Sequence, residues 1–105
     1  MPNSKERLTI RELQDFARRL EAARGFTDES PLEKCLLLGE EVGELFKAVR
    51  QRTGIKTDVQ TGTLSVADEL ADVLLFVLTI ANRFDIDLEE AVMHKKAKDG
   101  ARVWR

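Results

Sequence analysis

Two short acidic motifs contain the residues of this sequence that are best suited to chemistry. The first, at residues 40–44, reads Glu-Glu-Val-Gly-Glu, and the second, at residues 69–72, reads Glu-Leu-Ala-Asp. Each lies in a stretch with helical hydrophobic spacing and puts carboxylates on the side that should be apolar. An unpaired ionised group on such a side is costly or becomes protonated. Converging carboxylates of this kind predict a site for divalent cations.

Helical spacing places the acidic residues of both motifs on defined faces, because residues three and four apart lie on the same side of a helix. In the first motif Glu41 and Glu44 fall in an otherwise apolar line, with Glu40 at its edge. In the second motif Glu69 and Asp72 fall in a similar line. Two helices that pack along these lines would bring four carboxylates together, and mutual repulsion would raise their pKa values unless cations intervene. An all-oxygen ligand set favours Mg²⁺ or Mn²⁺ over zinc or copper.

A di-iron helical bundle is a competing interpretation of paired carboxylates. Its sites combine glutamates with Glu-x-x-His motifs. The single histidine, His94, follows Glu90 by four residues and Glu89 by five, so that spacing is absent. We therefore expect His94 to be an ordinary surface or interface residue.

The elements that must position these acids are four helices, which we expect at residues 9–23, 30–50, 65–83 and 87–98. The second helix has the clearest start, with Ser30 as N-cap, Pro31 in the first helical position and Glu33 completing a capping box. Gly25 ends the first helix, and Gly100 supplies a stop after the fourth. Residues 51–64 have no apolar period and form a loop, and residues 1–7 are expected to be flexible. The sequence thus predicts a single all-α domain over residues 1–105, a four-helix bundle.

The third expected helix is unusual because its residues 73–81 are almost all apolar. A helix that is apolar on every side is buried on every side. Three other short helices cannot easily surround it, so we expect a homo-oligomer, a homodimer or a homotetramer, with this helix near the interface. A well-covered central helix in a monomer is the alternative.

Composition limits the classes of partner and compartment. The chain has 105 residues, 43% of them hydrophobic and 34% charged, and a formal net charge of −2, so no basic field favours nucleic acid. The longest mainly apolar run is too short to cross a membrane, and residues 1–5 lack a signal-peptide core. The single cysteine, Cys35, is expected to be a small buried thiol. A cytoplasmic protein is the simplest interpretation.

The order and spacing of the acids resemble a known family. Glu-Glu-x-x-Glu followed, after the 24 residues 45–68, by Glu-x-x-Asp is similar to the pattern of MazG-type nucleotide pyrophosphohydrolases in the all-α NTP pyrophosphatase superfamily. Residues 38–45 and 67–74 resemble the two central helices of this family, and residues 23–26 resemble the Arg-Gly-aromatic turn before them. The resemblance covers roughly residues 8–104.

The resemblance implies a Mg²⁺-dependent enzyme, with Mn²⁺ able to substitute, that cleaves an NTP or dNTP between the α- and β-phosphates. It makes Glu41, Glu44, Glu69 and Asp72 the metal ligands. Glu40 is either a further ligand or, through a water, the base, and Glu41 shares the catalytic assignment. Neutralising a polyphosphate and activating water are tasks that such an ion performs.

The end of the chain also resembles the last segment of the family, where a lysine, an asparagine and an arginine approach the phosphates. Lys95 and Arg102 match by spacing, and Lys98 is a further candidate. Asp99 stands where asparagine is usual, so this position faces away from the phosphates or the contact is altered. The alternative is a helix end whose cations complement its dipole.

Base recognition has few candidates in the sequence. Phe26 and Trp104 adjoin segments expected at the site and could stack on a nucleobase, whereas Phe16 is expected to pack in the core. Lys34 either points toward the site or is solvated.

Two alternatives to a house-cleaning NTP pyrophosphohydrolase remain at this point. The first is a phosphoribosyl-ATP pyrophosphohydrolase, which belongs to the same superfamily and cleaves the same type of bond. The second is a non-catalytic helical oligomerisation or regulatory module with structural acids, for which divalent cations would not change thermal stability.

Overall fold

The computed structural model describes residues 7–54 and 63–100, which form four α-helices. They are α1 (Ile10–Arg24), α2 (Pro31–Arg52), α3 (Val66–Arg83) and α4 (Leu88–Gly100). The described residues contain no strand, so the predicted all-α class is confirmed. Each helix begins and ends within about two residues of its expected bounds, except that α4 includes Gly100, which was expected to stop it.

The first three helices begin at the hydroxyl N-caps that the sequence shows. Thr9 and Ser30 both form complete capping boxes, in which the hydroxyl accepts from the N3 amide and the N3 glutamate accepts from the cap amide. For α2 the Glu33 amide donates to Ser30 Oγ at 3.1 Å. Ser65 caps α3 in the simpler way, by accepting from the Asp68 amide. Caps of this kind each stabilise a helix by about 1 kcal/mol.

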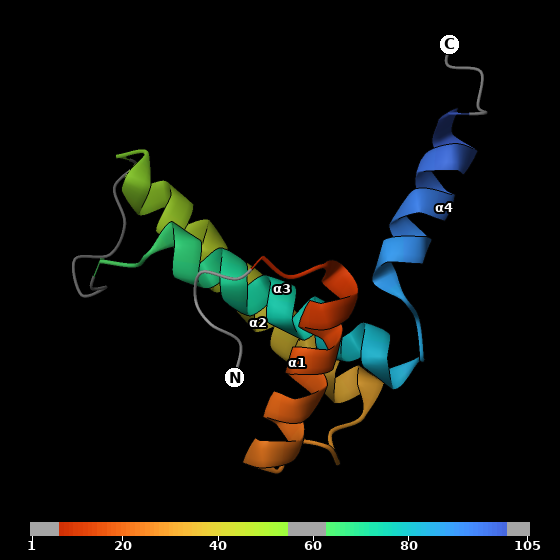
Figure 1. Cartoon of the computed structure of the whole chain (residues 1–105). Coiled ribbons are helices and arrows are strands. Elements are labelled where there is room, and N and C mark those ends of the chain that lie inside the picture. The colour runs from red at the N-terminus through yellow and green to blue at the C-terminus, as the bar shows by residue number, and fades with distance from the viewer. Residues whose placement is uncertain (1–6, 55–62, 101–105) are drawn as a thin grey trace.

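Helix α3 packs mainly along α2, and α1 crosses α3 (Figure 1). Helix α4 projects away from the α2–α3 pair and contacts α1 instead. The amide of Ile10 donates to Glu89 Oε1 at 2.9 Å at this contact. Among the described residues the buried apolar side chains are three alanines and one leucine, so the apolar core is small: Ala17, Ala48, Leu78 and Ala81.

A buried amide pair joins α1 to the end of α3. Gln14 and Asn82 are 6% and 8% exposed, and Gln14 Nε2 donates to Asn82 Oδ1 at 3.1 Å. Gln14 also donates to the carbonyl of Ile86 and accepts from the amide of Leu88. These bonds satisfy the buried amide of Gln14 and hold the α3–α4 turn against α1. In that turn Asp85 adopts a left-handed conformation, with φ of 53°.

A second buried polar group links α1, α2 and α3 through charge. Glu21 on α1 accepts from Nη1 and Nη2 of Arg83 on α3, each at 2.8 Å. Lys34 on α2 is 3% exposed and lies 2.7 Å from Glu21 Oε2 and 2.9 Å from Glu29 Oε1. Arg83 also donates to the carbonyls of Phe26 and Glu29. We call Glu21, Glu29, Lys34 and Arg83 the ion network.

Some side chains that were expected to be buried are exposed in the structure. Cys35 is exposed, so the prediction of a buried thiol is wrong. The reason is that Cys35 lies on the side of α2 away from α3. Helix α3 is not covered on every side within one chain, because Leu70 and Leu74 are 51% and 47% exposed. The predicted oligomer therefore remains a prediction.

No described helix is long and apolar enough to span a bilayer.

The ion network predicts a large loss of stability when Glu21 is changed. Burial opposes ionisation of Glu21, but hydrogen bonds from Arg83 and Lys34 outweigh it, so its pKa is lowered. Because this pKa is lowered, the ionised carboxylate stabilises the fold at pH values above the ordinary pKa of a glutamate. This contribution disappears as the pH falls through the pKa of Glu21 in the folded state. Glu21→Gln leaves the buried Lys34 and the partly buried Arg83 undercompensated, so we expect the free energy of unfolding at about pH 7 to fall by about 3 kcal/mol or more.

Urea unfolding of the wild type and Glu21→Gln at neutral and acid pH measures this effect. Asp15→Asn on the exposed face of α1 is the control. The difference between the wild type and Glu21→Gln should shrink as pH falls. A difference below about 1 kcal/mol at neutral pH, the scale of an exposed pair, would contradict the assignment.

Candidate metal centre and adjoining pocket

Three of the predicted acidic residues meet between α2 and α3. Glu41 on α2 and Glu69 and Asp72 on α3 each offer a carboxylate oxygen, and these oxygens lie within 4.8 Å of one another. Glu41 and Glu69 are half-buried, and Asp72 is exposed. The three residues come together because Glu41 lies on the same side of α2 as the buried Ala48, two turns before it. We call these three residues the carboxylate cluster.

The carboxylates of the cluster repel one another electrostatically. The pKa of Glu41 is raised above its usual 4.5, first by burial and then by the negative charges of Asp72, Glu69 and Glu44. A hydrogen bond with Glu69 acts in the same direction. Since a divalent cation would remove this repulsion, the cluster fits a metal better than it fits bare carboxylates.

The remaining two acids of the first motif lie beside the cluster. Glu44 adds to the negative charge at Glu41, and its Oε1 lies 3.6 Å from Lys47 Nζ, with both side chains about half exposed. Glu40 is exposed next to Glu41. The structure thus brings together three of the four predicted ligands and places Glu44 one turn along α2. The metal role of all four and the catalytic role of Glu40 remain predictions.

A pocket of about 150 Å³ adjoins the cluster between α1, α2 and α3. Asp72 lines one end of the pocket, so it belongs to both the pocket and the carboxylate cluster. Most of the remaining wall is apolar, with the aromatic rings of Phe26 and Phe76 and the side chain of Leu20. Arg24 and Lys34 bring positive charge to it. A cavity with aromatic walls next to a metal-binding cluster has the general form of a small-ligand site.

Lys34 is neither solvated nor free. Its ammonium is held in the ion network and lies 5.7 Å and 5.5 Å from the ring centroids of Phe26 and Phe76. Burial opposes the charged form, but hydrogen bonds to Glu21 and Glu29 raise the pKa of Lys34 above its usual value. The expectation of a solvated lysine is therefore wrong. The alternative, that Lys34 points toward the site, agrees with its position in the pocket wall.

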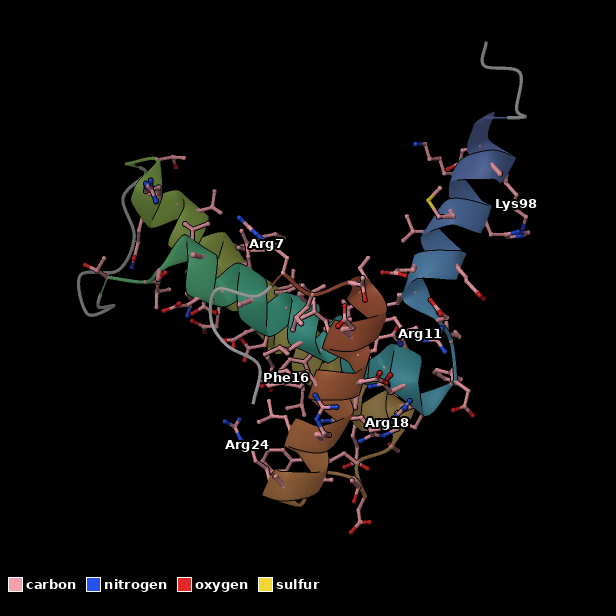
Figure 2. The ribbon with its side chains drawn as sticks, viewed as in Figure 1. Arg7, Arg11, Phe16, Arg18, Arg24 and Lys98 are labelled. Carbon is pink, nitrogen blue, oxygen red and sulfur yellow. The ribbon has the colours of Figure 1, made fainter. Side chains whose placement is uncertain are left out.

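The C-terminal candidates lie apart from the cluster. Lys95 and Lys98 are exposed on α4, and Lys95 Nζ lies 3.0 Å from Asp99 Oδ1. Figure 2 shows Lys98 on the outer part of α4, away from α2 and α3. Arg102 and Trp104 lie outside the described residues. His94 is exposed, as expected for a surface residue.

Sequence reasoning missed Glu21, Arg83 and the pocket role of Phe76. The signal for Glu21 was present, since it lies four residues after the buried Ala17 and interrupts the apolar side of α1. It is the same signal that indicated Glu41. Arg83 gave no such signal, because a cation in the last turn of a helix is common on dipole grounds alone.

The fold and the carboxylate cluster define a class of protein: an all-α domain with a group of carboxylates between two helices. Sequence comparison gives the family. Residues 29–102 match the MazG nucleotide pyrophosphohydrolase domain, so the chain belongs to this family.

Two comparisons involve one bacterial protein. The uncharacterised protein YpjD of Bacillus subtilis is 44% identical over 70 residues, which are 63% of this chain and 63% of that protein. The match thus spans less than two thirds of the relative. The crystal structure of YpjD, a candidate pyrophosphatase, superimposes with a TM-score of 0.80 at 32% identity, over 93% of this chain and 99% of that one.

The carboxylate cluster predicts stabilisation by metal. Millimolar Mg²⁺ or Mn²⁺ should raise the free energy of unfolding, by about 2.7 kcal/mol at ~100 times the dissociation constant. Because the raised pKa of Glu41 makes its ionisation costly, Glu41→Gln should stabilise the metal-free protein near neutral pH and lose the response to metal.

Thermal unfolding with each cation and with EDTA measures the response. Asp15→Asn is the control and should keep the wild-type response. Equal melting temperatures of the wild type with and without cations would contradict the assignment of a metal site.

Proposed function

We propose that the protein is a Mg²⁺-dependent pyrophosphohydrolase of nucleoside triphosphates, ribo- or deoxyribo-, releasing the monophosphate and pyrophosphate. The observation that supports this best is the carboxylate cluster of Glu41, Glu69 and Asp72 between α2 and α3, in a chain of the MazG family. The cluster supplies only oxygen ligands, which is the set that Mg²⁺ prefers.

In this proposal Glu41, Glu44, Glu69 and Asp72 hold the cation, which when bound neutralises phosphate charge and lowers the pKa of water. Glu40 or Glu41 accepts the proton of the attacking water. The bond between the α-phosphorus and the bridging oxygen breaks, and pyrophosphate leaves with that oxygen. Glu40 suits the proton-accepting role because it is exposed beside the cluster.

We assign the nucleobase to the pocket beside Asp72. Aromatic faces bind a base by stacking, and Phe26 and Phe76 present two rings on its wall. The base would then lie beside Lys34, while the phosphates extend past Asp72 toward the cluster.

The phosphates also need cations from the protein, and Lys95, Lys98 and Arg102 remain our candidates. Because α4 projects away from the α2–α3 pair, Lys95 and Lys98 reach the cluster only if α4 moves or belongs to a second copy. Lys34 and Arg24 lie on the wall of the pocket that we assign to the base, so they adjoin the base rather than the phosphates.

The first prediction of this proposal concerns the reaction. With Mg²⁺ the protein should release pyrophosphate, with an equal amount of monophosphate, from at least one of a panel of canonical and damaged NTPs and dNTPs, and EDTA should abolish the release. Phosphoribosyl-ATP in the same panel distinguishes the histidine-biosynthetic alternative. If no member of the panel reacted, the proposal would fail and a non-catalytic module would be favoured.

Substitution of a cluster residue should remove turnover without unfolding the protein. Glu41→Gln and Asp72→Asn keep the side-chain size but remove charge, so kcat should fall by at least ~100-fold while helical circular dichroism stays unchanged. Asp15→Asn should keep normal activity. Near-normal kcat in either cluster variant would show that the metal ligands lie elsewhere.

Substitution in the pocket should affect binding more than chemistry. Phe26→Ala removes a ring that is 45% exposed and so should cost little stability. We expect KM to rise by about ten-fold, since one stacking contact contributes about 1–3 kcal/mol, with kcat less affected. Phe84→Ala, which removes an exposed ring outside the pocket, is the control. An unchanged KM would place the base elsewhere.

A further inference from the structure

The ammonium of Lys34 has one more hydrogen-bond donor than its partners use. An ammonium carries three N–H groups. Two of them serve Glu21 Oε2 at 2.7 Å and Glu29 Oε1 at 2.9 Å, and the third has no oxygen or nitrogen acceptor among the described residues. The Lys34 side chain is only 4% exposed, so bulk water has little access to this donor. Because Lys34 lines the pocket beside Asp72, a ligand in the pocket can supply the missing acceptor.

Lys34 lies at the end of this pocket that is far from the carboxylate cluster. It precedes Glu41 on α2 by seven residues, which is about 10 Å along the helix. Thr79, which also lines the pocket, follows Asp72 on α3 by the same interval, and Phe76 lies between them. A nucleotide with its phosphates at the cluster and its base on Phe76 therefore directs the edge of the base opposite the sugar toward Lys34.

This end of the pocket offers a ligand donors more readily than acceptors. The oxygens of Glu21 are already bound by Arg83 and Lys34. The Thr79 hydroxyl donates its proton to the carbonyl of Phe76 at 2.9 Å, so it can only accept from a ligand, and as a neutral group. Hydrogen bonds that involve an ionised group contribute more than neutral ones. The charged donor of Lys34 therefore decides which group of a base is favoured here.

We propose that Lys34 donates a hydrogen bond to the exocyclic oxygen of the base, so that the protein prefers 4-oxopyrimidine and 6-oxopurine nucleotides. Uracil, thymine, guanine and hypoxanthine carry a carbonyl at this position. Cytosine and adenine carry an amino group, which would turn its own N–H toward the ammonium and leave the buried donor unpaired. The inference rests on the proposed function for the direction in which the nucleotide lies.

The surroundings of Lys34 suit this role. Its ammonium lies 5.7 Å and 5.5 Å from the ring centroids of Phe26 and Phe76, beyond contact distance, so the ring faces are left for a base and the charge meets the edge of that base. The ion network fixes the ammonium in place, and a fixed donor cannot follow a misplaced acceptor. Arg24, the other cation of the pocket wall, is exposed and therefore hydrated.

Matched pairs of substrates test the preference with the wild-type protein. UTP and CTP differ at the exocyclic group and in the proton on the adjacent ring nitrogen, and so do ITP and ATP. With Mg²⁺ we expect kcat/KM to be at least ~10-fold higher for UTP than for CTP and for ITP than for ATP, mainly through KM. Equal values, or a preference that the two pairs do not share, would overturn the inference and leave the pyrophosphohydrolase assignment intact.

Substitution of Lys34 tests whether this residue causes the preference. Lys34→Met removes the donor and keeps a long apolar side chain, so each ratio of kcat/KM should fall below ~3-fold. A ratio measured for two substrates on one preparation does not depend on the folded fraction, so a loss of stability does not imitate this result. Arg18→Met, which removes a positive charge from the exposed side of α1, should keep both ratios. Unchanged ratios in Lys34→Met would overturn the role of Lys34.

Binding separates this inference from the proposed function. If no triphosphate is hydrolysed, titration calorimetry of the metal-free wild type with UMP, CMP, IMP and AMP decides instead. Tighter binding of UMP than CMP and of IMP than AMP, by at least ~10-fold, would support the role of Lys34 although the proposed reaction had failed. Equal binding within each pair, or no binding of any monophosphate, would overturn it.

Discussion

The buried ion network is the interaction on which the arrangement of the first three helices depends. Glu21 binds Arg83 through both oxygens and Lys34 through one, so a single carboxylate on α1 joins α3 and α2. The apolar core of one chain is small, and it cannot by itself define how these helices cross. Removing one member of a buried ion group is costly because its partners remain charged. The network therefore specifies the packing that also forms the pocket beside Asp72.

Carboxylates that are removed from solvent occur in two different environments in this protein. At Glu21 a buried carboxylate is compensated by two cations of the chain, and its pKa is lowered. At Glu41 a half-buried carboxylate faces other carboxylates, and its pKa is raised. The first arrangement is complete within the chain and is structural. The second concentrates negative charge, and a divalent cation would relieve this repulsion.

Helix α2 connects the ion network and the carboxylate cluster because it contributes to both from one side, with Lys34 and Glu41 two turns apart. Its first turns supply Lys34 to the ion network, and its α3-facing side supplies Glu41 to the carboxylate cluster. On the opposite side of the helix Leu36 and Phe46 are exposed. A change at Leu36 or Phe46 is therefore separated from Lys34 and Glu41, which share the side of the helix that faces the rest of the chain.

The sequence by itself determined what depends on neighbours along the chain. Capping at Ser30 and the bounds of the helices are local properties, and so is the register that aligns Glu41 with Glu44 and Glu69 with Asp72. The tertiary structure decided what depends on how the helices cross. It buried Lys34, exposed Cys35, placed Phe26 and Phe76 on one pocket and directed α4 away from the cluster. Helical periodicity gives the side of a helix on which a residue lies, but not which helix, if any, covers that side.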